Sequence, residues 1–354
     1  MNANKIKLAD IIQRVSETNK ELMLTNKELV LGISIDKEFM PSVANLNGTD
    51  LSKYSILRKN RFAYNPMHVG RDERLPIALY RSNEVALISP AYEMFEVKPD
   101  SQVDLDYLML VFKTSWFDKA CWFYTDSSVR GGLSYNDFCN IEIELPLLDE
   151  QKKFVRQYNT IVNRINVLER LNEKLNIFGD TLFQKYSLSE SKHSYKLSDL
   201  TTVCTGKKDA NEADGYGNYP FFTCSKEFLW TNSFSYSGEA VLVSGNGDID
   251  VKYYNGCFEA YQRTYILMPT DSRYTAWLYF GLKSKLSSLT RDSKGSVISY
   301  LTKGSLENIT WYCSEELNET LLNNFTNIVS HIAKNNTEII LMKKIQHCLL
   351  SSMS

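Results

Sequence analysis

The segment Asp149–Tyr186, DEQKKFVRQYNTIVNRINVLERLNEKLNIFGDTLFQKY, decides the fold of this chain. Its apolar residues recur at steps of three and four, which places them on one face of a helix. The members of this ladder are Phe154, Tyr158, Ile161, Ile165, Leu168, Leu171, Leu175, Phe178 and Leu182. A helix of about 38 residues spans about 57 Å. It cannot bury such a face alone, so the pattern predicts a partner helix.

The segment Ser314–Leu350 supplies that partner, because its apolar residues follow the same rhythm. Its ladder consists of Leu321, Phe325, Ile328, Ile332, Asn335, Ile339, Met342, Ile345 and Leu349. We expect the two helices to pack antiparallel through Phe154, Tyr158, Ile161, Ile165, Leu168, Leu175, Phe325, Ile328, Ile332, Ile339 and Met342. Asn335 interrupts the second ladder and either sets the helix register or faces solvent.

Shorter segments ahead of the two helices also repeat, in the same order. The matched pairs are Lys7–Ile11 with Lys196–Leu200, Asp106–Thr114 with Ala276–Ser284, and Gly132–Tyr135 with Val297–Tyr300. Ordered matches of this kind favour an internal duplication. The alternative is two unrelated domains that each end in a long helix.

Length and composition fit a globular protein of about two domains. The chain has 354 residues, of which 43% are hydrophobic and 23% charged, and these proportions are ordinary. The predicted division is domain 1 at 1–148, long helix 1 at 149–190, domain 2 at 191–313 and long helix 2 at 314–354. We expect no membrane span and no signal peptide. The seven scattered cysteines fit reduced thiols in the cytoplasm.

Each globular half shows mixed α and β signals. Predicted strands lie at Glu84–Ser89, Tyr92–Val97, Ala240–Ser244 and Arg263–Met268, and Gly245–Asp248 is a strong turn signal. Asp149 and Ser314 are candidate N-caps of the long helices. The predicted fold class is α+β: two α/β domains related by a pseudo-twofold axis and separated by two long antiparallel coiled-coil helices.

Positive charge gathers locally although the net charge is −2. The first run consists of Arg58, Lys59, Arg61, Arg71, Arg74 and Arg81; the second consists of Lys283, Lys285, Arg291, Lys294 and Lys303. Phosphate contacts need a local positive face rather than a positive average. Each run is therefore either a DNA contact or a solvated face.

The junction Ile141–Gln151, IEIELPLLDEQ, resembles the step from recognition domain to helix in specificity subunits of type I restriction–modification systems. Family members usually show an Ile-x-Leu-Pro-x-x-x-Glu-Gln type of run there. Lys7–Asp10 and Lys196–Asp199 resemble the openings of their two target-recognition domains. The second junction, Trp311–Glu316, departs from the pattern, which leaves the start of the second helix open.

The resemblance covers the whole chain and implies its function. In this family each domain binds one part of a split double-stranded DNA target, and the helices fix the distance between the parts. The helices also dock two methyltransferase subunits, and restriction subunits can join. S-adenosylmethionine and ATP with magnesium are expected on those partners, and no cofactor on this chain.

The sequence contains no pattern that predicts catalysis. A P-loop is absent, and Tyr64–Met67 shares only two letters with an adenine methyltransferase motif. The four histidines have no zinc spacing. We therefore expect no catalytic residue, no bound metal and no enzymatic activity.

The candidate DNA contacts are basic, amide and hydroxyl side chains at predicted turns, because these groups bind phosphates and base edges. They are Arg58, Lys59, Arg61, Asn65, Arg71, Arg74, Arg81, Ser89, Arg130 and Tyr135 in the first half, and Lys207, Lys208, Lys226, Asn246, Lys252, Tyr253, Gln262, Arg263, Lys294 and Ser296 in the second. Two other functions stay open: a coiled-coil adaptor with protein-binding heads, and a self-contained methyltransferase. The sequence does not identify the target bases.

Overall fold

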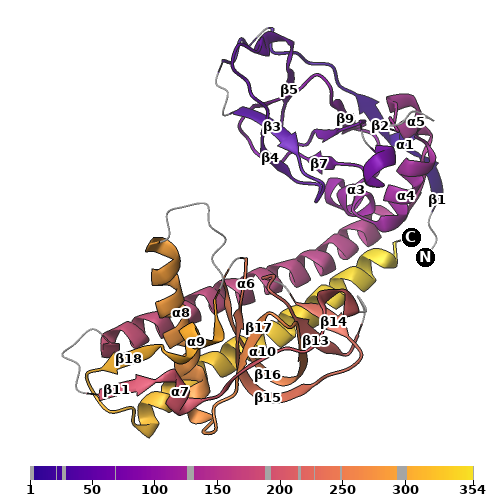
Figure 1. Ribbon diagram of the computed structural model, residues 1–354. Coiled ribbons are helices and arrows are strands. Elements are labelled where there is room, and N and C mark those ends of the chain that lie inside the picture. Colours follow the sequence, from indigo (N-terminus) through magenta and orange to yellow (C-terminus); the bar gives the residue numbers. More distant parts are fainter. Residues whose placement is uncertain are drawn as a thin grey trace. The chain divides into compact units, whose positions relative to one another are not determined.

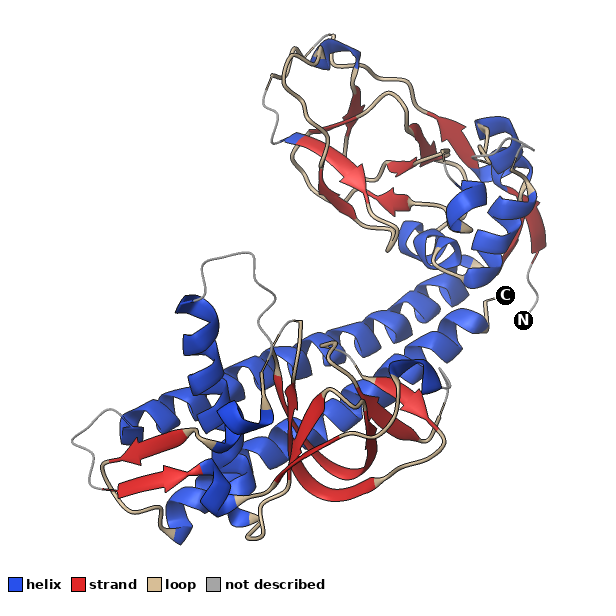
Figure 2. Cartoon of the chain, viewed as in Figure 1, coloured by secondary structure: helices blue, strands red, loops and turns tan. Residues whose placement is uncertain are grey.

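The computed structural model describes residues 4–20, 22–25, 29–67, 69–125, 131–187, 193–213, 217–226, 228–247, 249–292 and 301–353. The chain forms two compact units, Met1–Arg164 with Met342–Ser354 (unit 1) and Ile165–Leu341 (unit 2). Both units combine helices with sheets (Figure 2). The predicted mixed α/β fold with long helices is confirmed.

Unit 1 contains short strands and short helices. The strands are β1 Asn4–Lys7, β2 Ile12–Arg14, β3 Val30–Ile33, β4 Phe39–Pro41, β5 Ser55–Leu57, β6 Phe62–Tyr64, β7 Ile77–Leu79, β8 Ala86–Ile88, β9 Glu93–Val97 and β10 Glu142–Leu145. The helices are α1 Leu8–Ile11, α2 Val69–Asp72, α3 Leu105–Phe112, α4 Ser115–Phe123 and α5 Tyr135–Asn140, with a 3₁₀ turn at Leu51–Lys53. The sheets have the orders β2-β9-β6-β7, β4-β3-β8-β5 and β1-β10.

Unit 2 is built on longer strands. They are β11 His193–Lys196, β12 Val203–Thr205, β13 Tyr219–Phe222, β14 Leu229–Thr231, β15 Tyr236–Ser244, β16 Val251–Ala260, β17 Thr264–Leu267 and β18 Thr310–Cys313. The shorter helices are α7 Leu197–Leu200, α8 Arg273–Asp292 and α9 Lys303–Glu307, with a 3₁₀ turn at Ala210–Glu212. One sheet has the order β12-β17-β15-β16-β13-β14 and the other is β11-β18. As predicted, the chain bends at residues 245–247 between two antiparallel strands, β15 and β16; Asp248, the last residue of the predicted turn, lies outside the described residues.

The two units repeat one topology, in agreement with the repeated sequence segments. Each unit begins strand–helix–strand, β1-α1-β2 in one and β11-α7-β12 in the other. The first strand of each pairs antiparallel with the last strand before a long helix, β10 or β18. Each also contains one parallel pair, β3 with β8 and β13 with β16.

The central hairpin bends at matching places in both units. In unit 2, Gly238 and Gly256 face each other across β15 and β16 with φ of +122° and +144°. Glycine reaches such angles without a steric cost, so these two strands bend without breaking. In unit 1 the hairpin instead breaks into β5 and β6 on one side and β7 and β8 on the other. The turns at these breaks carry much of the first basic run.

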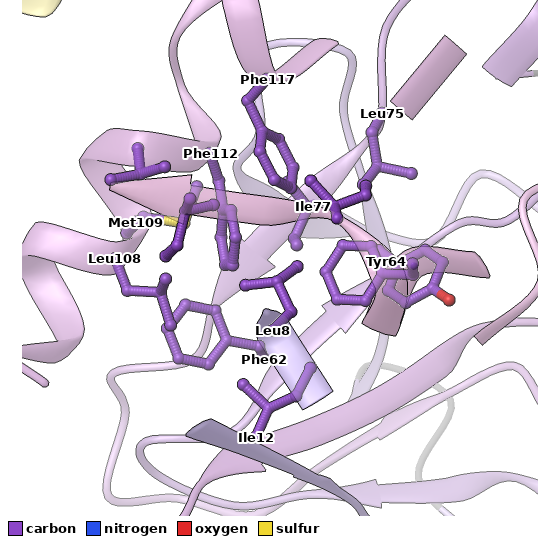
Figure 3. Close-up of a cluster of buried hydrophobic side chains, with 14 of the residues drawn as sticks. Leu8, Ile12, Phe62, Tyr64, Leu75, Ile77, Leu108, Met109, Phe112 and Phe117 are labelled. Atoms are coloured by element: carbon purple, nitrogen blue, oxygen red, sulfur yellow. The ribbon is translucent and has the colours of Figure 1, made fainter. Parts of the chain in front are cut away.

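Aromatic side chains dominate the cores. Figure 3 shows the unit 1 cluster, in which Phe62 from β6 and Phe112 from α3 pack together. Phe95 stacks on Phe62 at 5.0 Å between ring centroids. The unit 2 core contains Trp277 from α8 and Trp311 from β18, with centroids 5.3 Å apart. Burial of such rings stabilises each unit by about 2–3 kcal/mol per side chain before entropy is counted.

The long helices are α6, Leu148–Ser187, and α10, Glu319–Ser351 (Figure 1). Helix α6 begins one residue before Asp149, so Asp149 lies in the first turn and the predicted cap there is wrong. Helix α10 begins five residues after Ser314, and Asn318 Oδ1 accepts from the Leu321 amide at 2.9 Å. Asn318 is therefore the cap instead of Ser314, whose amide donates to Tyr186 O.

The inward face of α6 follows a heptad, which corrects part of the predicted ladder. Its heptad positions are Tyr158, Ile165, Leu168, Asn172 and Gly179, which are buried, and Ile161, Leu175 and Leu182, which are half-buried. Val155 and Phe183 are also buried beside this face. Leu171 and Phe178 are 44% and 58% exposed, so their assignment to the buried face is wrong. Two heptad positions hold Asn172 and Gly179. Each directly follows the apolar residue, Leu171 or Phe178, that was predicted to be buried. Ile345 of α10 is likewise exposed.

The two helices contact each other within each unit. In unit 2, Phe183 lies 6.4 Å from Phe325, centroid to centroid. Asn335 Nδ2 donates to Asn172 Oδ1 at 2.8 Å, so Asn335 faces the partner helix rather than solvent. In unit 1, Gln346 Nε2 donates to the Tyr158 hydroxyl at 2.8 Å. Of the other predicted interface residues, Ile165, Leu168, Ile328 and Ile339 are buried, and Phe154, Ile161, Leu175, Ile332 and Met342 are half-buried.

Candidate nucleic-acid interface

Four connections meet at one edge of the large sheet of unit 2. We call residues 206–208, 223–226, 244–247 and 261–263 the loop cluster. The amide of Gly245 donates to Arg263 O at 2.9 Å, and that of Gln262 donates to Lys208 O at 3.0 Å. Ser244 Oγ and Cys224 O are 3.5 Å apart. Segments that are distant in the sequence therefore form one continuous surface.

Two glycines permit the close approach within the loop cluster. A Cβ at Gly245 would lie 2.5 Å from Arg263 O, and one at Gly206 would lie 2.1 Å from Ala260 O. Main-chain atoms cannot yield to such contacts without moving a strand end. The choice of glycine at these two positions thus follows from packing.

The loop cluster presents donors and positive charge to solvent. Lys207, Lys226, Gln262 and Arg263 have exposed side chains, and Asn246 is half-buried. Ammonium and guanidinium groups bind phosphates, and amides bind the edges of adenine. This set can therefore contact both the backbone and the bases of a duplex.

Two further lysines at the loop cluster are held by protein groups. Lys208 Nζ lies 2.5 Å from Ser233 Oγ and 3.5 Å from Oε2 of Glu259, which is fully buried. Lys252 Nζ donates to Ser225 O at 2.6 Å and pairs with Asp250 at 3.4 Å. Both lysines connect neighbouring strands and loops, and each is less available to phosphate than Lys207 or Lys226.

The remaining residues predicted in unit 2 do not gather at the loop cluster. Tyr253 is half-buried and packs on Tyr279 at 6.3 Å between ring centroids. Lys283 turns toward α6, where Asn176 Oδ1 lies at 3.1 Å and Asp180 at 3.3 Å. Lys303 pairs with Glu307 one helical turn away. Lys294, Ser296 and the side chain of Arg291 lie outside the described residues.

The corresponding edge of unit 1 carries Asn65, Ser89 and Tyr135. Asn65 Oδ1 accepts from the Met67 amide at 2.9 Å, which shapes the turn after β6. Ser89 Oγ accepts from the Ala91 amide at 3.3 Å in the turn between β8 and β9. The Tyr135 ring opens α5 beneath the guanidinium of Arg14, 5.3 Å away. Arg130 and the side chain of Arg71 lie outside the described residues.

Four side chains of the first basic run bind other side chains of the protein. Arg58 and Arg61 both bind Glu17 at 2.6 Å. Hydrogen bonds from these two arginines hold the pKa of Glu17 at about 2. Arg81 pairs with Asp106, and Lys59 donates to Asn83 Oδ1 at 2.8 Å. These side chains hold the turns at the hairpin breaks, and their role as DNA contacts stays a prediction.

A cavity of about 880 Å³ lies beside α4 in unit 1. Arg74, Lys113 and Lys119 line it together with Trp122 and Phe123. Beneath it, the ammonium of Lys37 binds Asp118 at 2.6 Å, and desolvation lowers the pKa of Lys37. This buried pair ties the turn between β3 and β4 to α4. Arg74 lines this cavity with an exposed side chain.

Neither a metal cluster nor a membrane helix occurs in the described part of the chain. No group of three or more His, Cys, Asp or Glu side chains there could hold a metal ion. No helix in those residues is long and apolar enough to cross a membrane.

Comparison with known families gives one matching model, the type I restriction modification DNA specificity domain, over residues 189–310. A curated relative, the type I restriction enzyme EcoDI specificity subunit of Escherichia coli, is 39% identical over 127 residues. That match covers 36% of this chain and 28% of the relative, so the chain spans less than a third of the relative's length. The region matched by the family model contains the whole loop cluster.

Solved structures extend the likeness to the whole fold. An S subunit of a type I restriction-modification system from M. genitalium aligns over 100% of this chain and 96% of its own, with TM-score 0.60 and 15% identity. An HsdS subunit from Thermoanaerobacter tengcongensis aligns over 99% and 96%, with TM-score 0.41 and 14% identity. The family model and the Escherichia coli relative confirm the family resemblance inferred from the sequence, and the M. genitalium structure shows that the fold is shared.

Proposed function

Since residues 189–310 form a type I restriction modification DNA specificity domain within a chain that has the fold of a specificity subunit, we propose that this protein recognises a bipartite double-stranded DNA target. Unit 1 binds one half-site and unit 2 the other. It acts in the cytoplasm and directs partner subunits to the target without catalysing a reaction itself.

The loop cluster is the observation that carries this proposal. It joins segments distant in sequence into one surface, and its exposed side chains include three cations and an amide. A surface for a protein partner would favour a central apolar patch instead. Lys207, Lys226 and Arg263 are the proposed phosphate or base contacts in unit 2.

The paired helices suit the spacing of a split target. A bipartite site gains affinity from tethering only when the linker spans the two half-sites at the right distance. Helix α6 runs through 40 residues, about 60 Å at 1.5 Å per residue. A flexible linker would give a broad distribution of distances instead.

An apolar face of α6 in unit 2 supports docking of partner subunits. Val167, Leu171 and Phe178 are 44–58% exposed, and their spacing of four and seven residues places them on one side of the helix. We propose that two methyltransferase subunits, with restriction subunits where present, dock on the helices and bring S-adenosylmethionine, ATP and magnesium.

The salt dependence of duplex binding tests the proposal. Binding of the full-length chain should weaken steeply as salt rises, because released counterions oppose it. Replacing Lys207, Lys226 and Arg263 together with alanine should lower the slope of log K against log salt by about 2.7, at 0.9 per phosphate contact. Lys303→Ala is the matched control, because Lys303 already pairs with Glu307.

Two outcomes would contradict the proposal. Duplex affinity that is absent or insensitive to salt would indicate an adaptor with protein-binding heads. Binding of S-adenosylmethionine to the isolated chain in calorimetry would indicate a methyltransferase. Methylome sequencing of cells that express the chain with its co-purifying subunits should show adenine methylation at one split motif.

A further inference from the structure

The guanidinium of Arg14, which is not among the contacts predicted from the sequence, is fixed on two sides. Its Nε donates to Glu93 Oε2 at 2.8 Å and its Nη2 to Glu93 Oε1 at 2.6 Å. The Tyr135 ring lies against it, 5.3 Å from the guanidinium carbon to the ring centroid. The side chain is nevertheless 58% exposed. Among the described residues, no hydrogen bond reaches Nη1.

Arg14 lies at the end of the sheet where unit 1 carries Asn65 and Ser89. It ends β2, and its partner Glu93 begins β9 directly after the turn that contains Ser89. In β6, Tyr64 faces Glu93 across the sheet, and Asn65 follows. Asn65 and Ser89 therefore lie at the same end of the sheet as Arg14.

The same strand end carries positive charge in unit 2. Arg14 pairs with Phe95 as the last residue of β2, and Thr205 pairs with Tyr265 as the last residue of β12. Gly206 and Lys207 follow Thr205 and belong to the loop cluster. Unit 2 thus places a cation, Lys207, two residues beyond the position that corresponds to Arg14.

Arg14 differs from the arginines at the hairpin break. Arg61 is only 14% exposed, and it shares Glu17 with Arg58 and also donates to Ile56 O at 2.9 Å. Its donors are used inside the protein. Glu93 binds Arg14 through one edge, which leaves Nη1 and the second hydrogen of Nη2 directed outward as a fork.

We propose that this fork donates two hydrogen bonds to O6 and N7 of a guanine in the major groove of the unit 1 half-site. The inference rests on the proposed function and names one of its base contacts. The planar fork of arginine matches these two acceptors in geometry, whereas lysine is a point charge on a flexible stem that Glu93 cannot hold by two donors. Glu93 and Tyr135 position the fork before DNA arrives, which reduces the entropy lost on binding.

A double-mutant cycle between the side chain and the base tests the contact. Selection from random duplexes first defines both half-sites with the full-length chain, and Arg263→Ala identifies the half-site of unit 2. Each guanine in the other half-site is then replaced by 7-deazaguanine, which lacks N7. One replacement should weaken binding by wild type about tenfold, since 1.4 kcal/mol is tenfold and such contacts discriminate by about 1–3 kcal/mol.

The protein variants complete the cycle. Arg14→Ala should weaken binding to the unmodified site and show no further loss with 7-deazaguanine. Arg14→Lys, which keeps the charge, should retain the salt slope but lose the preference for that guanine. Gln13→Ala is the matched control, because Gln13 pairs with Glu96 on the opposite face of the same strands and should leave both unchanged.

The outcomes separate this inference from the proposed function. A unit 1 half-site without guanine, or equal losses from 7-deazaguanine in wild type and Arg14→Ala, would overturn the Arg14 contact alone. A chain that selects no sequence at all would overturn the proposed function. Circular dichroism and thermal melting of each variant verify that the fold is retained, and Arg14→Lys tests the contact if Arg14→Ala does not fold.

Discussion

Gln151 fixes the point at which α6 leaves unit 1. The side chain is fully buried. Its Nε2 donates to Pro146 O at 2.8 Å and to Gln102 O at 2.9 Å, and its Oε1 accepts from the Asp104 amide at 2.8 Å. One amide thus joins the strand–helix junction to the start of α3, which explains the glutamine in the Leu-Pro-x-x-x-Glu-Gln run.

Gln151→Ala should destabilise unit 1 by about 3 kcal/mol, because it leaves one buried and two part-buried main-chain groups without their side-chain partner. Urea unfolding followed by circular dichroism measures this loss. Gln157→Ala, on the exposed face of the same helix, should change stability by less than about 0.5 kcal/mol. Equal effects of the two changes would contradict the role assigned to Gln151.

Glu17 should make the stability of unit 1 depend on pH. Arg58 and Arg61 lower its pKa from 4.5 to about 2. The stabilisation is present above pH 4.5 and is lost as pH falls through about 2, because the folded state holds the charged form. Glu17→Gln should cost about 1 kcal/mol at pH 7. A difference from wild type that stays constant between pH 7 and pH 2 would contradict this assignment.

The basic run around Glu17 shows why single residues were hard to assign from sequence. Arg58, Arg61 and Arg81 are close together in the chain, but their partners Glu17 and Asp106 come from distant segments. Charge clustering in sequence therefore did not predict a positive face. Lys207, Lys226 and Arg263 are far apart in sequence and share a surface only because β12, β13, β15 and β16 end together.

At the scale of elements, Gly179 allows α8 to approach α6. A Cβ at Gly179 would lie 2.1 Å from the Phe280 ring, and Phe280 is fully buried. Alanine improves helix propensity by about 1 kcal/mol, but overpacking of a buried ring costs about 1–3 kcal/mol. The steric cost therefore outweighs the gain in helix propensity.

Gly179→Ala should therefore lower the thermal stability of unit 2. Gly304→Ala in α9 is the matched control, because no atom lies within 4 Å of the added Cβ. The control should be neutral or stabilising by up to about 1 kcal/mol. Calorimetric melting of both variants measures the two effects. A Gly179→Ala protein more stable than wild type would show that the Phe280 ring moves away from the added methyl group, and would contradict the expected steric cost.

The hydrogen-bonded asparagines between α6 and α10 should lower the stability of the helix pair and fix its register. Asn172 accepts from Asn335 and donates to Asn336 Oδ1, each at 2.8 Å. Replacing both Asn172 and Asn335 with leucine should stabilise the helix pair, since a polar layer in a heptad seam costs stability. Asn172→Leu alone should destabilise it by about 1 kcal/mol. Thermal melts of the two single variants and the double variant measure the coupling.

Long helices were predictable because their heptad pattern is local and continuous. The residues that line the contact between the two helices were harder to predict. Asn172 and Gly179 occupy buried heptad positions although neither is an apolar side chain of the predicted ladder. Leu171 and Phe178 are apolar but exposed. The start of α10 was misplaced because Ser314 and Asn318 both suit a cap, and the choice depends on the contact of Ser314 with Tyr186.

At the scale of the molecule, duplication explains both the shared topology and the division of the proposed function. Each unit repeats the strand–helix–strand opening and the parallel pair, yet the side chains at the sheet edges differ. Such copies suit two unlike half-sites. The sequence predicted this organisation because order and periodicity survive divergence, whereas the turn residues proposed to contact DNA do not repeat.

Selection of random duplexes by the full-length chain tests the central claim most directly. Wild type should enrich one motif of two half-sites at a fixed spacing, and Arg263→Ala should alter only one of them. Failure to enrich any motif, or enrichment of one uninterrupted site that Arg263→Ala leaves unchanged, would contradict the account.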